Sequence, residues 1–175
     1  MQKINKQCGI LYLTRTKLNP PSLKLIYQSL IHPLITYCSL AWGGISNDQL
    51  KSINIAHKRV IRTIANLRRY DHTNQTFKDL GILKFYDILK LRYATFVYKS
   101  LHNQGDHNFR RRANPNYNMR NDSVLIPPRM RSSQSQTSAL YQSVQVWNSI
   151  PITIRSKPSV ASFKRAYKLD ILSGY

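Results

Sequence analysis

The sequence predicts a mainly α-helical protein. Apolar residues recur at spacings of three and four along most of the 175 residues, and the strict alternation typical of strands is almost absent. Proline, glycine and asparagine interrupt these segments, which indicates separate helices joined by turns. Apolar residues make up 42% of the chain, enough to build a core. We therefore expect a helical bundle over 1–102, a basic flexible linker over 103–136 and a small helical element over 137–175.

The chain has far more basic than acidic residues. Lysine and arginine supply 27 residues and aspartate supplies 7, without any glutamate, so the formal net charge is +20. A surface of this charge favours a polyanion as partner. No two aspartates lie closer than eight positions, which excludes local carboxylate pairs for magnesium and glutamate-dependent zinc motifs. Unless distant aspartates converge, we expect no catalytic residues, no metal site and no cofactor.

Two helices are predicted before residue 45. The first covers 4–15 and has Ile4, Cys8 and Leu11 on one face. The second follows the break at 19–21, with Ser22 as its N-cap. Its predicted apolar face consists of Leu23, Ile26, Leu30, Leu34 and Cys38. We expect Pro33 to disturb the last turns of this helix and the glycines at 43 and 44 to end it.

The uncharged stretch 25–42 is about as long as a membrane-spanning helix. Its Gln, Ser, His, Pro and Thr residues make insertion unfavourable, so we interpret it as a core helix. A basic membrane-associated protein is the less favoured alternative.

Cys8 and Cys38 each lie in an apolar stretch. We expect both to be buried free thiols, as in a nuclear or cytoplasmic protein. No signal peptide opens the chain, because the first apolar run is short and ends at Arg15. Secretion is therefore not expected.

The third predicted helix covers 47–67, with Asn47 as its N-cap, and is amphipathic. Its apolar sector consists of Leu50, Ile53, His57, Val60, Ile61 and Ile64. His57 is expected to be a core histidine rather than a catalyst. The opposite face carries Lys51, Lys58, Arg62 and Arg69 at steps of seven, four and seven, with Arg59 beside them. No acidic partner at i+4 balances this stripe, which favours contact with phosphates over simple solvation.

A short helical turn is expected to start at Thr73 or Thr76 and to end at Gly81, a residue suited to a left-handed C-cap. The helix at 84–102 is apolar nearly all round, which is typical of the centre of a bundle. Its aromatic residues are interpreted as core, with stacking on bases as the weaker alternative.

The linker at 103–136 is polar, basic and interrupted by proline. Arg110, Arg111 and Arg112 make it either an arm for phosphates or an ordinary basic linker. After it, 137–147 is predicted to form a helix, and Ser159 is predicted to cap a last one. The buried face of that last helix is predicted to consist of Val160, Phe163, Tyr167 and Ile171.

Five stretches have a familiar order: LIYQSLIHPLITYCSLAWGG, LKSINIAHKRVIRTIANL, LGILKFYDILKLRYATFVYKSLHN, VWNSIP and SFKRAYKLDIL. Together they closely resemble the region after the palm in LINE-type, jockey-like non-LTR retrotransposon reverse transcriptases. The resemblance extends from about residue 4 to residue 175.

This resemblance implies that the chain corresponds to the thumb, a helical bundle that grips template and primer, and to the segment beyond it. The Tyr-x-Asp-Asp turn of the palm is missing, as are the fingers and the endonuclease domain. We therefore expect a non-catalytic fragment of an RNA-directed DNA polymerase, with the missing palm and fingers and an RNA/DNA or DNA duplex as partners. The residues expected to touch phosphates are Lys51, Lys58, Arg59, Arg62, Arg68 and Arg69, followed by Arg110, Arg111 and Arg112. The alternative is an inert, marginally stable transposon remnant without a partner.

Overall fold

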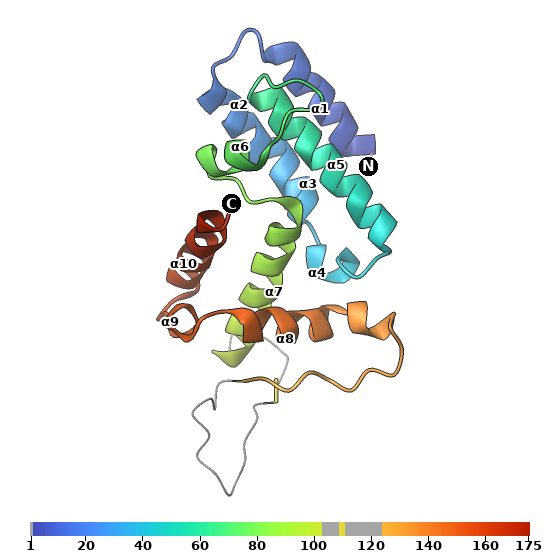
Figure 1. Ribbon diagram of the computed structural model, residues 1–175, viewed down its shortest axis with the longest axis vertical. Coiled ribbons are helices and arrows are strands. Elements are labelled where there is room, and N and C mark those ends of the chain that lie inside the picture. Colours follow the sequence, from blue (N-terminus) through green and yellow to red (C-terminus); the bar gives the residue numbers. More distant parts are fainter. Residues whose placement is uncertain (1, 103–108, 111–123) are drawn as a thin grey trace, which may run out of the picture. The chain divides into compact units, whose positions relative to one another are not determined.

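The computed structural model describes residues 2–102, 109–110 and 124–175 and is mainly helical (Figure 1). Its contacts divide the chain into two compact units. Unit 1 consists of Met1–Ser39, Ile45–Ile88 and Ile171–Tyr175, and unit 2 of Leu40–Gly44 and Leu89–Asp170. The division thus cuts through helices, among them α7 and α10. The sequence-based division into 1–102, 103–136 and 137–175 stays a prediction, and much of 103–136 lies outside the described residues.

Helix α1 (Gln2–Thr14) confirms the first predicted helix, with Ile4, Cys8 and Leu11 buried. Helix α2 (Pro20–Ile26) begins earlier than predicted. Its N-cap is Asn19, whose Oδ1 accepts a hydrogen bond from the Ser22 amide at 3.0 Å. The prediction of Ser22 as the cap is wrong, because prolines are well tolerated in the first helical turn, where their missing N–H groups are not needed.

The predicted buried face of the second helix is mostly wrong. A π-helical turn, η1 (Tyr27–Ile31), separates α2 from α3 (His32–Thr36). The buried residues are Leu23, Tyr27, Ile31 and Ile35, each four positions after the last. Of the predicted face, only Leu23 is among them. Pro33 gives a local reason for the wide turn, since it has no N–H to bond the carbonyl four residues earlier and its ring would clash there.

The chain leaves helical geometry at Tyr37 and turns through Cys38, which has a φ of 48°. Helix α4 (Ser39–Trp42) follows. Cys38 is exposed, so its predicted burial is wrong, whereas Cys8 is buried as expected. Throughout the part of the chain that the structure describes, we find no helix with the length and apolar character needed to cross a membrane.

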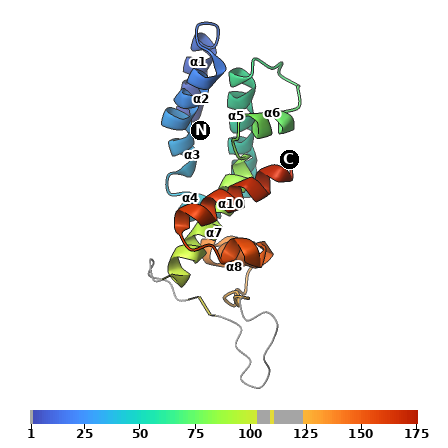
Figure 2. The same ribbon diagram turned by 90° about the vertical axis from the view of Figure 1, so that its left-hand side faces the viewer.

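Helix α5 (Asn47–Ile64) contacts both α1 and α2 in unit 1 (Figures 1 and 2). Asn47 is its first residue rather than its cap, and Ser46 occupies the cap position. The helix ends before the predicted residue 67, because Asn66 adopts a φ of 53°. The predicted apolar face is confirmed, since its residues are buried apart from the half-buried Ile53.

Helix α6 (Asn74–Asp79) is followed by its C-cap Leu80 and by Gly81, whose φ of 60° confirms the predicted left-handed position. The C-terminal residue also belongs to unit 1. The Tyr175 hydroxyl accepts a hydrogen bond from the Lys84 amide and donates one to Asp87 Oδ2, each at 2.7 Å. These bonds hold the chain end beside the start of α7.

Unit 2 has an aromatic core. It contains most of α7 (Phe85–Leu101), the 3-10 turn η2 (Ser135–Thr137), α8 (Ala139–Ser149), α9 (Ile152–Arg155) and most of α10 (Val160–Ser173). The Phe163 ring stacks on Tyr98 with 4.7 Å between centroids and lies 5.8 Å from Trp147. Ser159 Oγ accepts from the Ser162 amide, so the predicted cap of the last helix is confirmed.

Candidate nucleic-acid interface

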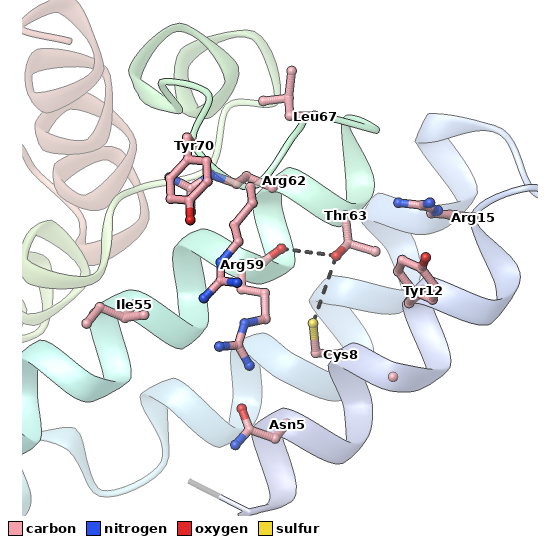
Figure 3. A pocket seen from close by; sticks show the side chains of 12 residues that line it. Asn5, Cys8, Tyr12, Arg15, Ile55, Arg59, Arg62, Thr63, Leu67 and Tyr70 are labelled. Carbon is pink, nitrogen blue, oxygen red and sulfur yellow. Dashed lines mark hydrogen bonds between the residues drawn. The ribbon is translucent and has the colours of Figure 1, made fainter.

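A groove of about 730 Å³ runs between α1 and α5 in unit 1 (Figure 3). The residues that line it come from α1 and the residue after it, from α5 and from the loop after α5. They are Asn5, Cys8, Gly9, Tyr12, Arg15, Ile55, Arg59, Arg62, Thr63, Leu67, Arg69 and Tyr70. The groove is therefore built from segments about fifty residues apart in the sequence.

The α1 wall arises from helical spacing. Asn5, Cys8, Tyr12 and Arg15 follow one another at intervals of three and four, so they share one side of the helix. Cys8 connects this wall to α5, because its Sγ lies 3.9 Å from Thr63 Oγ1. Tyr12 and Arg15 lie further along the same side (Figure 3).

The α5 wall contains two of the predicted phosphate contacts, Arg59 and Arg62, but not Lys51 or Lys58. Lys51 is exposed and pairs with Asp48 at 3.3 Å. No acid lies at i+4 from the stripe, but Asp48, three residues before Lys51, also reaches it. Lys58 is half-buried.

Arg69 lines the groove from the loop after α5, so a helical wheel does not predict its position. Arg69 lies beyond the end of the helix, so the predicted continuous stripe from Lys51 to Arg69 is wrong. Asp71 orders the loop: its carboxylate accepts from the Arg68 amide at 2.8 Å, and its backbone carbonyl accepts from Arg62 Nε at 3.1 Å. Arg69 then lines the groove, while Arg68 is exposed outside it.

The groove lining is basic and aromatic. Within the described ranges it includes Arg15, Arg59, Arg62 and Arg69, and no aspartate. The Arg15 guanidinium lies 4.1 Å from the centroid of the Tyr12 ring, and that of Arg69 lies 5.7 Å from Tyr70. Uncompensated guanidinium groups in a concave surface attract phosphates and other anions.

Unit 2 carries a second group of cations. The pKa of Lys164 is lowered, first by its partial burial and then by the positive charges of Arg92 and Lys99. Arg110, from the predicted basic arm, is exposed, and its carbonyl accepts from the Ile126 amide at 2.9 Å. Arg111 and Arg112 lie outside the described residues.

His57 lies in the core of unit 1, as predicted. It is fully buried, and its Nε2 is 2.9 Å from the Tyr27 hydroxyl. Burial, followed by the charge of His32, lowers the pKa of His57 to about 3, and burial raises the pKa of Tyr27 above its usual value. A neutral histidine enclosed in this way is a packing residue.

Within 2–102, 109–110 and 124–175, no group of three or more His, Cys or Asp residues could hold a metal ion.

Sequence reasoning missed Tyr12, Arg15 and Tyr70. The available signal was the spacing of Tyr12 and Arg15, four and seven residues after Cys8, which places them along the same side of the first helix. That spacing does not reveal which helix lies next to them. No family model, curated protein or solved structure matches this chain.

Proposed function

We propose that this chain is a non-catalytic nucleic-acid-binding segment that holds an RNA/DNA or DNA duplex through its phosphates. This is the role implied by its resemblance to the thumb region of LINE-type reverse transcriptases, with the palm and fingers of such a polymerase as its protein partner. The observation that carries the proposal is the groove between α1 and α5, with guanidinium groups on both walls.

The spacing of these groups suits a phosphate backbone. A rise of about 1.5 Å per residue separates Arg59 from Arg62 by about 4.5 Å along α5, and neighbouring packed helices lie about 8–10 Å apart. Two arginines of one wall can therefore contact adjacent phosphates while Arg15 contacts the strand from the other wall. Such contacts position a nucleic acid without reading its sequence.

The charge of the whole chain supports the same partner. A formal net charge of +20 attracts any polyanion from a distance, and each phosphate that the protein neutralises releases counterions. We expect the logarithm of the affinity to fall linearly with the logarithm of the salt concentration.

The test is fluorescence anisotropy with a labelled RNA/DNA hybrid over a salt series. The Arg15→Gln, Arg59→Gln double variant should weaken binding about tenfold or more and reduce the salt slope by about 2. The matched control, Lys78→Gln with Arg165→Gln, removes the same charge from exposed positions outside the groove. Equal losses in both double variants would show that net charge acts without a defined site.

A third double variant, Lys51→Gln with Lys58→Gln, separates the contribution of the groove to binding from that of the basic residues of α5 outside it. Both residues are predicted phosphate contacts that do not line the groove. We expect a smaller loss than in the groove variant. The inert-remnant alternative predicts that the unmodified chain binds no nucleic acid even at low salt.

A further inference from the structure

Two tyrosines of the groove are unusually accessible. Tyr70 is 85% exposed and Tyr12 is 55% exposed, although each is a large, partly apolar side chain. Both line the same groove, and they come from different segments, the loop after α5 and the helix α1 (Figure 3). Two aromatic rings therefore accompany the arginines in one concave surface.

Each ring has an arginine beside it. Arg15 lies over Tyr12, and Arg69 lies near the face of Tyr70. These cation–π contacts restrict the rings without burying them. The loop that carries Tyr70 is itself ordered by the bonds to Asp71. The rings are thus presented at the groove by ordered segments.

Phosphate contacts alone do not distinguish a duplex from a single strand, but exposed aromatic rings do. The bases of a duplex are already stacked on one another, whereas an unpaired base has a free face that stacks on an aromatic side chain. The groove volume of about 730 Å³ lies within the usual range for pockets that enclose small ligands, roughly 300–1,000 Å³. A single nucleotide is of a size that such a space can hold.

We propose that the groove binds an unpaired segment of nucleic acid, with a base stacked on Tyr70, another on Tyr12, and phosphates on Arg59 and Arg62. This inference rests on the proposed function. The chain holds a nucleic acid, and the groove binds the unpaired strand of it. The expected substrate is a single strand, or a duplex with a single-stranded overhang.

The experiment compares three labelled DNAs of the same sequence: a single strand, a blunt duplex and a duplex with an overhang. The unmodified chain should bind the single strand and the overhang more tightly than the blunt duplex. Tyr70→Leu and Tyr12→Leu should each weaken single-strand binding about 5- to 150-fold, the range for loss of one stacked base, with an unchanged salt slope. Tyr70→Phe should retain most of the affinity.

Tyr37→Leu is the matched control, because Tyr37 is 76% exposed and does not line the groove. Circular dichroism checks that each variant is folded. The inference is overturned if the leucine variants bind the single strand normally while Arg15→Gln with Arg59→Gln weakens it, an outcome that leaves the proposed function intact. Equal affinity of the unmodified chain for all three DNAs also overturns it. Absence of binding at low salt to every DNA and also to the RNA/DNA hybrid overturns the proposed function itself.

Discussion

The tyrosines of the groove and those of the aromatic core have the same chemistry and opposite surroundings. Tyr12 and Tyr70 in unit 1 are exposed and lie beside arginines. Tyr98 and Tyr167 in unit 2 are 1% and 5% exposed and stack on Phe163. The Tyr98 hydroxyl donates to the Lys157 carbonyl, so its polar end is satisfied inside the fold.

The comparison teaches that residue type alone does not assign a role to an aromatic side chain. In unit 2 the rings bury apolar area and hold α7, α8 and α10 together, so their loss should reduce stability. In unit 1 the groove rings bury little, so their loss should affect binding alone.

Phe163→Ala should lower the free energy of unfolding by about 3–5 kcal/mol, because it leaves a cavity among aromatic rings. Trp42 and Trp147 both belong to unit 2, so tryptophan fluorescence during urea unfolding reports on this region. Leu169→Ala is the control on the same helix, since Leu169 is 59% exposed. A similar small change in both variants would remove the distinction between core and surface on α10.

Acid should destabilise unit 1 through His57. Folding lowers the pKa of this histidine from 6.5 to about 3, so between these values the unfolded chain binds a proton that the folded chain excludes. The free energy of unfolding should be unaffected by His57 above pH 6.5, then fall by about 1.4 kcal/mol per pH unit, or about 3 kcal/mol by pH 4. Urea unfolding followed by circular dichroism measures this slope. His57→Gln should abolish it, whereas His72→Gln, at an exposed position, should leave it unchanged.

Asn148→Ala should lower the free energy of unfolding by about 1–3 kcal/mol, because it removes the hydrogen-bond partners of both the N–H and the carbonyl of Leu125. The Asn148 amide accepts from the Leu125 N–H at 3.0 Å and donates to the Leu125 carbonyl at 2.9 Å. Gln145→Ala, at an exposed position of the same helix, is the control in the same urea experiment. Equal stability of the two variants would show that the two hydrogen bonds between Asn148 and Leu125 do not stabilise the fold.

Tyr70→Leu should change the free energy of unfolding by no more than about 0.5 kcal/mol, as is usual for surface positions. Thermal or urea unfolding monitored by circular dichroism checks this value. A loss comparable with that of Phe163→Ala would mean that Tyr70 supports the fold and would remove the contrast between the two groups of tyrosines.

Much of the helical fold could be predicted from local patterns. Helical periodicity predicts the faces of α5 and the core positions Phe163 and Tyr167 of α10. Gly81 and Ser159 have their predicted roles because turn and cap chemistry is local. The face of the α2 to α3 segment was not predictable by a regular wheel, because the π turn changes the spacing of buried positions to four. Cys38 was predicted to be buried because it lies in an apolar stretch, but the helix ends before it and the chain turns there.

The candidate site was predicted only in part. Arg59, Arg62 and Arg69 were identified from their charge and line the groove, whereas Lys51, Lys58 and Arg68 lie outside it. Tyr12 and Arg15 were not identified, because their relation to α5 is a contact between segments about fifty residues apart.

By itself the sequence determined the helical character, the excess of basic residues and the apolar faces of the regular helices, because these depend on composition and on neighbours within one or two turns. The tertiary structure decided that α1 lies against α5, that the loop at Asp71 turns Arg69 and Tyr70 toward them, and that Tyr12 and Tyr70 remain exposed. The physical reason is that a groove arises from packing between distant segments. Its shape depends on which buried side chains meet, and no local spacing in the sequence encodes that pairing.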